Sequence, residues 1–357
     1  MIKKYVFPCV ALAASSVAMA QSSVTLFGVM DAGVTRVSGS GAGHRLGLSS
    51  GSNAASRLGF RGVEELGGGL SASFWLEGAI TADSGTGAGG GPFTFQRRAS
   101  VSLSSKRFGE LRLGRDFAPN WWNVALFDPF GARGVATSQA FNNLGYNAVY
   151  SSNSIGYILP TGLGGIYGQA QYAFGEKAST SANSKQGNTL SGRLGYANGP
   201  LNAAVAYSVF KQVVGASDIA PVTIGRDLKL FNMAASWDFG VVKPIVYYGQ
   251  EKVPGNAAGN ARLDSFLLGA TAPLGAGELR ATIARYDMKG SANDFNKFAL
   301  GYGHFFSKRT QVYVAVAKLS NKGAGKRSLG VDGLSSVGAT TAGGHSSGFD
   351  LGIRHNF

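Results

Sequence analysis

The feature that most constrains the fold of this chain is an alternation of apolar and polar side chains with a period of two residues. Residues 349–357, FDLGIRHNF, are an example in which Phe349, Leu351, Ile353 and Phe357 alternate with polar residues or glycine. A period of two places the two kinds of side chain on opposite faces of a β-strand. About sixteen such segments recur at a spacing of roughly 21 residues, and no helical period separates them. The sequence therefore predicts an all-β chain with few helices.

The connections between these segments are of two kinds, which alternate along the chain. Short connections lie at 64–69, 105–109, 197–200, 239–240 and 307–310. Long connections, rich in glycine, serine, alanine and asparagine, lie at 38–54, 82–93, 176–188 and 320–346. Antiparallel strands joined by tight turns at one end and by long loops at the other produce this pattern.

Two architectures fit alternating antiparallel strands. In a soluble sandwich or barrel the apolar face is the protein core, but sixteen strands enclose more volume than side chains can fill. In a transmembrane barrel the apolar face contacts lipid and the polar face lines a water-filled lumen. The polar face of this chain carries many charges, at Arg57, Arg61, Glu77, Arg98, Arg112 and Arg193. Because an arginine facing lipid costs about 2–4 kcal/mol at mid-membrane, we predict a 16-stranded antiparallel transmembrane β-barrel.

The N-terminus, MIKKYVFPCVALAASSVAMA, has the three parts of a secretory signal peptide: two lysines, an apolar stretch and an A-x-A cleavage site ending at Ala20. A buried or membrane-spanning helix is the alternative, but the apolar run is too short to cross a bilayer. We therefore predict a cleaved leader at residues 1–20 and one barrel domain at residues 21–357. The one cysteine, Cys9, lies in the leader, so the mature chain has no disulfide.

Net charge limits the partners that the predicted barrel can have. The chain carries a formal charge of +14, which becomes +12 when Lys3 and Lys4 are removed with the leader. Such a charge favours nucleic acid, an acidic membrane surface or an anionic solute. Because the predicted leader exports the chain, we expect no nucleic acid, and we expect small anionic solutes as partners.

Several stretches resemble the general porins of Gram-negative outer membranes, in particular the trimeric sixteen-stranded group from β-proteobacteria. They occur in family order along the mature chain: SSVTLFGVMDAGV (22–34), SRLGFRGVEELGGGL (56–70), FGELRLGR (108–115), DPFG (128–131), NSIGY (153–157), SKRT (307–310) and the C-terminal GIRHNF. The resemblance implies a homotrimer in the outer membrane, in which each subunit is a diffusion channel narrowed by its third long loop. It also implies that the terminal Phe357 is recognised by the barrel-assembly machinery.

The third long connection, from about Asp116 to Gly145, has enough apolar surface to pack rather than to extend into water. Its aromatic residues include Trp121, Trp122, Phe127, Phe130 and Phe141. An ordered extracellular loop is one interpretation. The resemblance instead implies a third extracellular loop that folds into the lumen as a constriction, with DPFG at a tight turn. We then expect Asp128 to lie near the pore and Arg133 to project into it.

Arginines on the predicted second to fifth strands share the parity of the lumen, namely Arg57, Arg61, Arg98 and Arg112. The resemblance implies that such a basic wall faces acidic groups, for which the candidates are Asp116, Asp128, Glu77 and Glu110. Counting Asp116, Asp128 and one of the two glutamates, bases outnumber acids, and the mature chain carries +12, so we expect a preference for anions. An anion about 5 Å from one arginine gains on the order of 3 kcal/mol at an effective dielectric constant near 20. Alternatively, the arginines only pair with Glu77, Glu110 and loop backbone, and so rigidify the wall.

One position departs from the family pattern. Many relatives have an arginine three residues before the NSI motif, where this chain has Tyr150. Two-residue parity directs Tyr150 to the lumen, where it would weaken the basic wall or offer a stacking surface to an organic anion. A bulge in the strand would reverse this facing.

A barrel enzyme and an outer-membrane receptor or adhesin are the alternatives to a channel. An enzyme needs a nucleophile or an activated water with an oriented base. The four histidines have no Ser/His/acid setting, HExxH is absent, and GAGKRS (323–328) lacks the first glycine and the hydroxyl residue of a phosphate loop. We therefore predict no catalytic residue, cofactor or metal. The long loops leave a receptor or adhesin open, and the basic charge also suits lipopolysaccharide and outer-membrane lipids as partners.

Overall fold

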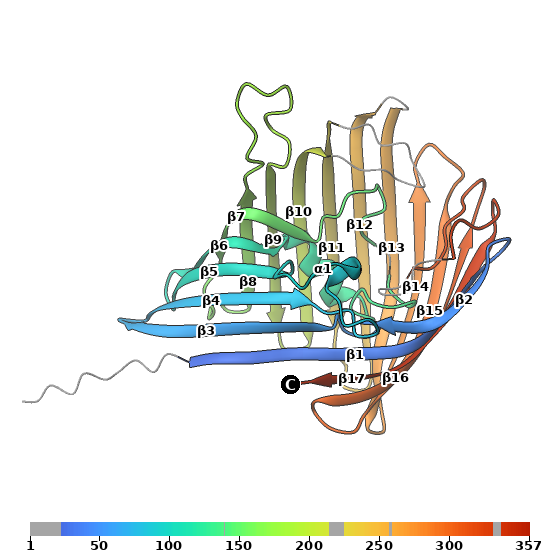
Figure 1. Ribbon diagram of the computed structural model, residues 1–357, viewed down its shortest axis with the longest axis horizontal. Helices are drawn as coiled ribbons and strands as arrows, with labels where there is room; N and C mark the ends of the chain where they lie inside the picture. The colour runs from blue at the N-terminus through green and yellow to red at the C-terminus, as the bar shows by residue number, and fades with distance from the viewer. Residues whose placement is uncertain (1–22, 139, 214–224, 257–258, 331–336) are drawn as a thin grey trace, which may run out of the picture.

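The computed structural model describes residues 23–138, 140–213, 225–256, 259–330 and 337–357. These residues form one antiparallel sheet that curls into a barrel (Figure 1), together with the nine-residue helix α1 (Pro119–Phe127) and the 3₁₀ helix η1 (Ala88–Gly90). Of the helices in this part of the chain, none has the length and hydropathy that crossing a membrane requires. The predicted leader at residues 1–20 lies outside the described residues.

The described residues form seventeen strands, and each strand is antiparallel to its neighbours. In chain order they are β1 (Ser23–Gly39), β2 (Gly43–Ser50), β3 (Arg57–Gly67), β4 (Leu70–Ala79), β5 (Arg98–Ser105), β6 (Gly109–Phe117), β7 (Tyr150–Ile158), β8 (Ile166–Ala173), β9 (Thr189–Asn198), β10 (Leu201–Val213), β11 (Arg226–Trp237), β12 (Lys243–Asn256), β13 (Gly259–Leu274), β14 (Gly277–Met288), β15 (Phe295–Phe305), β16 (Thr310–Asn321) and β17 (His345–Asn356). Because consecutive strands are antiparallel, the long connections all leave the barrel at one end, which is the extracellular end in barrels of this kind.

The sheet closes because β1 pairs with strands from both ends of the chain. Residues 29–39 of β1 pair with β17, and the two halves of β1 pair with β2 and β3 on its other side. β2 and β3 are thus two parts of one barrel strand, interrupted at residues 51–56, and the barrel has sixteen strands. Closure leaves no unpaired backbone edge, which lipid does not tolerate. The predicted 16-stranded antiparallel barrel is confirmed.

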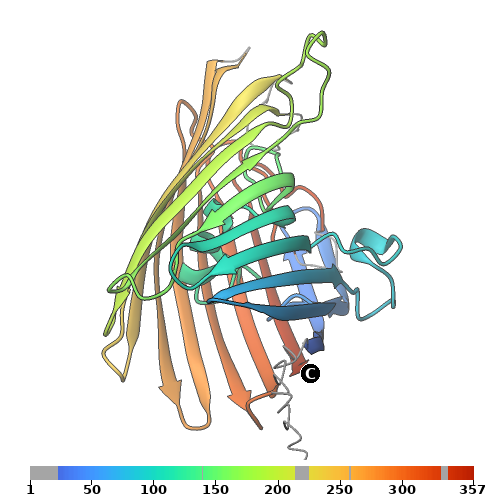
Figure 2. The same ribbon diagram turned by 90° about the vertical axis from the view of Figure 1, so that its left-hand side faces the viewer.

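One predicted loop is instead mostly strand. The glycine-rich stretch 38–54 was expected to be a long connection, but β1 extends to Gly39 and β2 begins at Gly43. Gly41 and Gly43 have φ angles of 72° and 73°, a region that glycine adopts without steric cost, so three residues suffice for the turn. The other long connections behave as expected, and the one that carries η1 projects away from the barrel wall (Figure 2).

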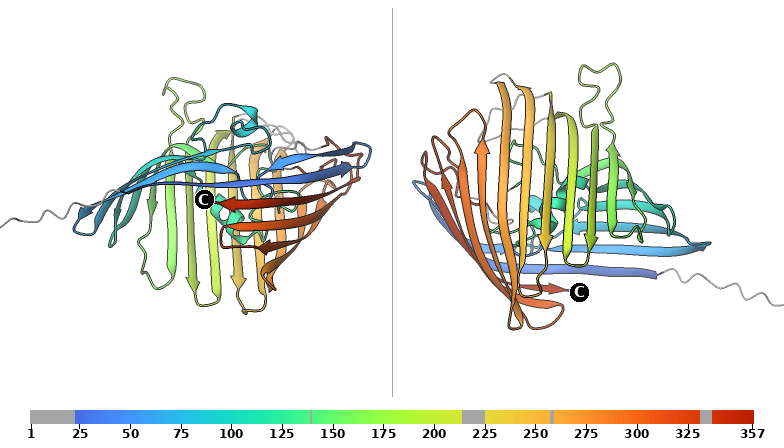
Figure 3. Two further views of the ribbon diagram at one scale, coloured as in Figure 1. Left: turned by 60° about the horizontal axis from the view of Figure 1, so that its bottom comes forward. Right: turned by 180° about the vertical axis from the view of Figure 1, so that it is seen from behind.

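Residues 349–357 run beside β1 at the seam of the barrel (Figure 3). The Gly28 N–H donates to the Phe357 carbonyl oxygen at 3.0 Å, and the Phe357 N–H donates to that of Gly28 at 3.1 Å. Leu351 and Ile353 on the outward face are about half exposed, whereas Asp350 on the opposite face is buried. The alternation at the end of the chain therefore separates an outward apolar face from an inward polar face, as expected.

The segment between β6 and β7 contains α1 and packs against the inside of β8–β12. Pro119 is the first residue of the helix, where its fixed φ is favourable and its missing N–H is not needed. Trp121, Val124 and Phe127 are buried in the main apolar cluster of the protein. In Figure 1 the helix lies between the crossing walls formed by β3–β6 and by β10–β13. The apolar core is therefore inside the barrel, at the level of this segment.

Candidate functional site

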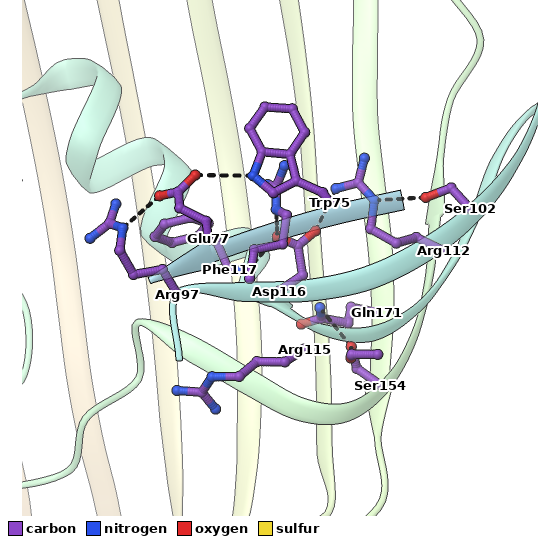
Figure 4. A network of polar contacts seen from close by, with 12 residues as sticks. Trp75, Glu77, Arg97, Ser102, Arg112, Arg115, Asp116, Phe117, Ser154 and Gln171 are labelled. Carbon is purple, nitrogen blue, oxygen red and sulfur yellow. Dashed lines mark hydrogen bonds and ion pairs between the residues drawn. The ribbon is translucent and has the colours of Figure 1, made fainter. Parts of the chain in front are cut away.

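The strands β3–β6 form one wall of the barrel, and their inward side chains are rich in charge (Figure 4). Cross-strand register identifies which side chains share this face: Gly59 lies opposite Glu77, and Glu77 lies opposite Arg98. Ser102, four residues from Arg98 on the same strand and so on the same face, lies opposite Arg112. These charged residues therefore come from successive strands but line one surface.

Glu77 is the first of two carboxylates around which the arginines gather. Its Oε1 lies 2.5 Å from Arg97 Nε and 3.6 Å from Arg57 Nε, and its Oε2 accepts a hydrogen bond of 3.1 Å from Trp75 Nε1. The Arg57 side chain is 29% exposed and that of Glu77 only 7%, so the arginine is the group that water reaches. Two-residue parity missed Arg97, because this residue precedes β5 and turns toward Glu77 from outside the strand pattern.

Asp116 is the second such carboxylate. Its Oδ1 lies 2.7 Å from Arg98 Nε, and its Oδ2 pairs with Arg112 Nη1. Arg112 also contacts Glu110, with 2.6 Å between Nη2 and Oε1. The pairing that the sequence analysis left open as an alternative is therefore present at Arg98 and Arg112, although with Asp116 as the main partner.

Arg61 differs from the other inward arginines of this wall. Its guanidinium carbon lies 5.6 Å from the centre of the Phe27 ring and 5.4 Å from that of Trp75, within the range of cation–π attraction. The two rings pack edge to face at 5.0 Å, so the arginine lies against a joined aromatic surface. Among the described residues, no carboxylate oxygen lies within ion-pair distance of Arg61, and its side chain is exposed. Arg61 thus presents a full positive charge to the lumen.

Asp128, which the sequence predicted to lie near the pore, is buried inside the loop. It is only 5% exposed, and its carboxylate accepts the backbone N–H groups of Phe130, Ala132 and Ser138 at 2.9, 3.1 and 2.7 Å. Burial raises the pKa of this carboxyl above its ordinary value. The role of Asp128 in the structure is therefore to organise the DPFG turn.

Arg133 belongs to the same turn as Asp128. Its N–H donates to the Phe130 carbonyl oxygen at 3.2 Å. The inward direction of Arg133 stays a prediction.

A β-bulge separates Tyr150 from the regular part of β7. The register of β6 and β7 shifts between Gly114 and Asp116, and Asn153 on β7 has a positive φ of 53°. Asp116 lies opposite Ser151, so Tyr150, the next residue, belongs to the other face of the ladder. The bulge thus breaks the parity from which the lumen facing of Tyr150 was predicted, and the side chain packs against the apolar cluster inside the barrel.

Tyr150 is enclosed by aromatic and basic side chains at the end of β7. Its ring lies 4.8 Å from that of Phe117, and the guanidinium group of Arg115 stacks on it at 5.0 Å. Its hydroxyl oxygen accepts a hydrogen bond of 3.2 Å from Arg97. Tyr150 therefore supports the wall arginines from the end of the strand.

The loop is held on one side by amides and hydroxyls of β9–β11. Asn123 donates to Asn232 at 2.8 Å and accepts a hydrogen bond from Arg193, while Ser208 donates to Asn120 at 2.8 Å. Of these residues only Arg193 was singled out from the sequence. Asparagine and serine on an inward face are typical of any water-filled barrel, so their sequence positions gave no sign of a loop contact.

The loop is held on the other side by buried charges. Glu251 on β12 accepts the N–H of Asn143 at 2.9 Å, and Asp350 on β17 accepts that of Val135 at 2.7 Å. Lys297 on β15, which is 3% exposed, donates to a loop carbonyl oxygen. Sequence reasoning missed these three anchors, although each is a charged residue at an inward position of its strand.

Comparison with known proteins agrees with this architecture. The sequence matches the family of Gram-negative porins over residues 9–324. Outer membrane porin protein 32 of Delftia acidovorans is 39% identical over the whole of both chains. An outer membrane porin protein of Bordetella pertussis is 28% identical over 83% of this chain and 88% of its own length.

Solved structures share the barrel. The anion-selective porin from Comamonas acidovorans is 37% identical, with a TM-score of 0.85 over 94% of this chain and all of its own. The trimer form of in-vitro folded OmpT from Vibrio cholerae has the same fold at 17% identity, with a TM-score of 0.66 over 94% of this chain and 99% of its own. Given a closed sixteen-stranded barrel and a family match over most of its length, the chain belongs to the Gram-negative porin family of the outer membrane.

Proposed function

We propose that this outer-membrane channel passes small hydrophilic solutes and ions and prefers anions. The observation that carries the proposal is the charge of one cluster on the inner wall, gathered around Trp75, Glu77 and Asp116. In this cluster five guanidinium groups accompany three carboxylates, an excess of two positive charges. The groups belong to Arg57, Arg61, Arg97, Arg98 and Arg112, and to Glu77, Glu110 and Asp116. The 37% identical porin from Comamonas acidovorans is described as anion-selective, which supports the same preference here.

Arg61 has the largest part in this preference, because no described carboxylate neutralises it. An anion about 5 Å from its guanidinium group gains on the order of 3 kcal/mol at an effective dielectric constant near 20. Salt reduces this attraction, since the Debye length is about 8 Å at physiological ionic strength. The expected result is a preference for anions and not an exclusion of cations.

The other site residues act through the wall or the loop in this proposal. Arg57 adds to the positive field where its side chain meets water, while Arg98 and Arg112 are largely neutralised by Asp116 and Glu110. The segment 118–149 narrows the lumen, because anchors on both sides of the barrel hold it there. The five aromatic residues of this segment that were noted in the sequence pack in or against the apolar cluster and so stabilise the segment inside the barrel.

We also propose how the chain is exported, processed and assembled. Residues 1–20 would be cleaved as a leader after export, and residues 21–357 would form the barrel domain. The mature chain would assemble as a homotrimer, among lipopolysaccharide and other outer-membrane lipids. Phe357 would be recognised by the barrel-assembly machinery. The relatives are porins, which are channels and not enzymes.

The test is the zero-current potential of the purified protein in a planar bilayer that separates two KCl concentrations. Chloride should carry most of the current in the native protein. Arg61→Gln should lower the chloride-to-potassium permeability ratio roughly fivefold, if screening leaves about 1 kcal/mol of the attraction. Arg309→Gln, which removes the same charge from a tight turn, is the matched control. A cation-selective native protein would contradict the anion preference, and absence of any current would contradict the channel.

A further inference from the structure

Three basic residues form a row on the outward face of β11, β12 and β13, near the end from which the long loops leave. Lys229 lies directly opposite Lys252, and Lys252 lies directly opposite Arg262. They share strand parity with outward apolar residues such as Met233 and Phe266, each about half exposed. These three residues, named here the basic row, therefore face away from the lumen.

The basic row lowers the stability of the protein when no anionic ligand is bound to it. Like charges directly opposite each other on neighbouring strands destabilise a sheet. Arg262 has a carboxylate partner, because its Nε and Nη2 lie 2.8 and 2.7 Å from the two oxygens of Asp264. Lys229 and Lys252 have no ion-pair partner among the described residues. The register thus sets two lysines opposite each other, and the nearby carboxylate of Asp227, whose charge also acts on Lys229, is already paired with Lys211.

An aromatic row lies below the basic row on the same three strands. The ring centres of Phe231 and Tyr248 are 6.3 Å apart, and those of Tyr248 and Phe266 are 5.0 Å apart. These rings are two to four residues from the basic row toward the tight-turn end, which is roughly 7–14 Å at 3.4 Å per residue. Aromatic rings on the outside of membrane barrels mark the boundary between acyl chains and headgroups. The basic row therefore lies at the height of lipid headgroups.

Neighbouring outward residues extend the positive surface but are partly neutralised. Lys211 lies 2.7 Å from Asp227, and Lys289 lies 2.6 Å from Asp287, with 43% and 45% of their side chains exposed. These pairs are at the ends of the cluster and not at its centre. The part of this outward surface with the most uncompensated charge is therefore the pair of lysines in the basic row.

We infer that the basic row binds the phosphate groups of an anionic membrane lipid whose acyl chains lie on the aromatic row. A phosphorylated glycolipid of the outer leaflet has both parts that this surface requires: negative charge at headgroup height and apolar chains beneath it. A phosphate between Lys229 and Lys252 would convert their mutual repulsion into attraction for a shared partner. The inference gives a location to the lipopolysaccharide contact proposed above, and it rests on that proposal.

The experiment measures binding of diphosphorylated lipid A to the purified, detergent-solubilised protein by native mass spectrometry. Each lysine near an anionic lipid contributes about fivefold in affinity, so Lys229→Gln with Lys252→Gln should weaken binding roughly 30-fold. The matched control is Lys177→Gln with Lys185→Gln, which removes the same charge from an exposed loop and should leave binding unchanged. Lipid A without phosphates should bind native and mutant protein equally weakly.

Three outcomes decide the inference. Binding that is lost in the basic-row variant alone supports it. Equal binding by native protein and the basic-row variant overturns it, as does equal loss in the loop control, which would mean that only net charge matters. Competition by inorganic phosphate as strong as that by lipid A would show a phosphate site without a lipid and would also overturn it. Channel conductance of the basic-row variant should be native, so a failure here is distinct from a failure of the channel proposal.

Discussion

The inner wall of β3–β6 and the outer rim of β11–β13 both concentrate basic side chains, but they compensate them differently. On the wall, Asp116 lies between two arginines, at 2.7 Å from Arg98 and in contact with Arg112. On the rim, Lys229 and Lys252 lie opposite each other, and neither has an ion-pair partner among the described residues. The number of cations is therefore a poor guide to local charge. The position of the counter-charge decides whether a basic cluster stabilises the protein or keeps a net positive charge that can bind an external anion.

The largest expected effect comes from removing the counter-charge from the wall, which tests whether compensation stabilises the wall arginines. Asp116→Asn leaves Arg98 and Arg112 without their shared carboxylate, and breaking a buried ion pair in this way costs about 3 kcal/mol or more. We expect a loss of this size in the free energy of unfolding, measured by denaturant titration of the barrel in lipid vesicles. Asp83→Asn, in an exposed loop, is the control with the same charge change. An unchanged stability would mean that the wall does not depend on this carboxylate.

A smaller effect separates paired from unpaired arginines on the same wall. Arg61→Gln removes an uncompensated charge, whereas Arg98→Gln removes one that Asp116 already balances. The permeability ratio of chloride to potassium should therefore fall roughly fivefold for Arg61→Gln and less than about twofold for Arg98→Gln. Bilayer measurements under one salt gradient compare the two directly. Equal shifts would show that charge count, and not pairing, determines selectivity.

The smallest effect has the opposite sign and concerns the rim. Lys252→Gln should raise the free energy of unfolding by about 0.5 kcal/mol in lipid-free detergent, because it relieves repulsion from Lys229. The same substitution should lose this advantage when phosphorylated lipid is added. Lys177→Gln in an exposed loop should change neither value. A destabilising Lys252→Gln in detergent would indicate that the rim lysines are compensated within the protein.

The sequence was sufficient for the architecture, because two-residue alternation specifies both the strands and the face of each side chain. It was sufficient for the closing contact between the segment ending at Phe357 and β1, since an outward apolar face needs a paired neighbour on both sides. It failed at 38–54, where glycine-rich composition was taken for a loop although the backbone continues as strand. Composition indicates that a segment can adopt turn conformations, but not whether hydrogen bonds to a neighbouring strand keep it extended.

The site was less predictable than the fold for three physical reasons. Two-residue parity predicts the face on which a side chain lies but not its interaction partner, so it could not predict the ion pair of Arg98 with Asp116. A single bulge beside Asn153 shifts the parity of β7, so that parity alone does not give the direction of Tyr150. The path of the inward loop depends on anchors far away in sequence, such as Glu251, whose role only the folded contacts reveal.

The seam between β1 and β17 has a consequence for biosynthesis. It joins segments about 300 residues apart, as in the 2.7 Å hydrogen bond from Ser346 Oγ to the Ser38 carbonyl oxygen. Until the later strand is translated and arrives, the earlier one keeps a free edge that can template pairing with other chains. Contacts so distant in sequence also form slowly. The protein is thus most prone to aggregation while the chain is in transit and the barrel is not yet closed. During this time a chaperone must shield both the open strand edges and the apolar surface that will contact lipid.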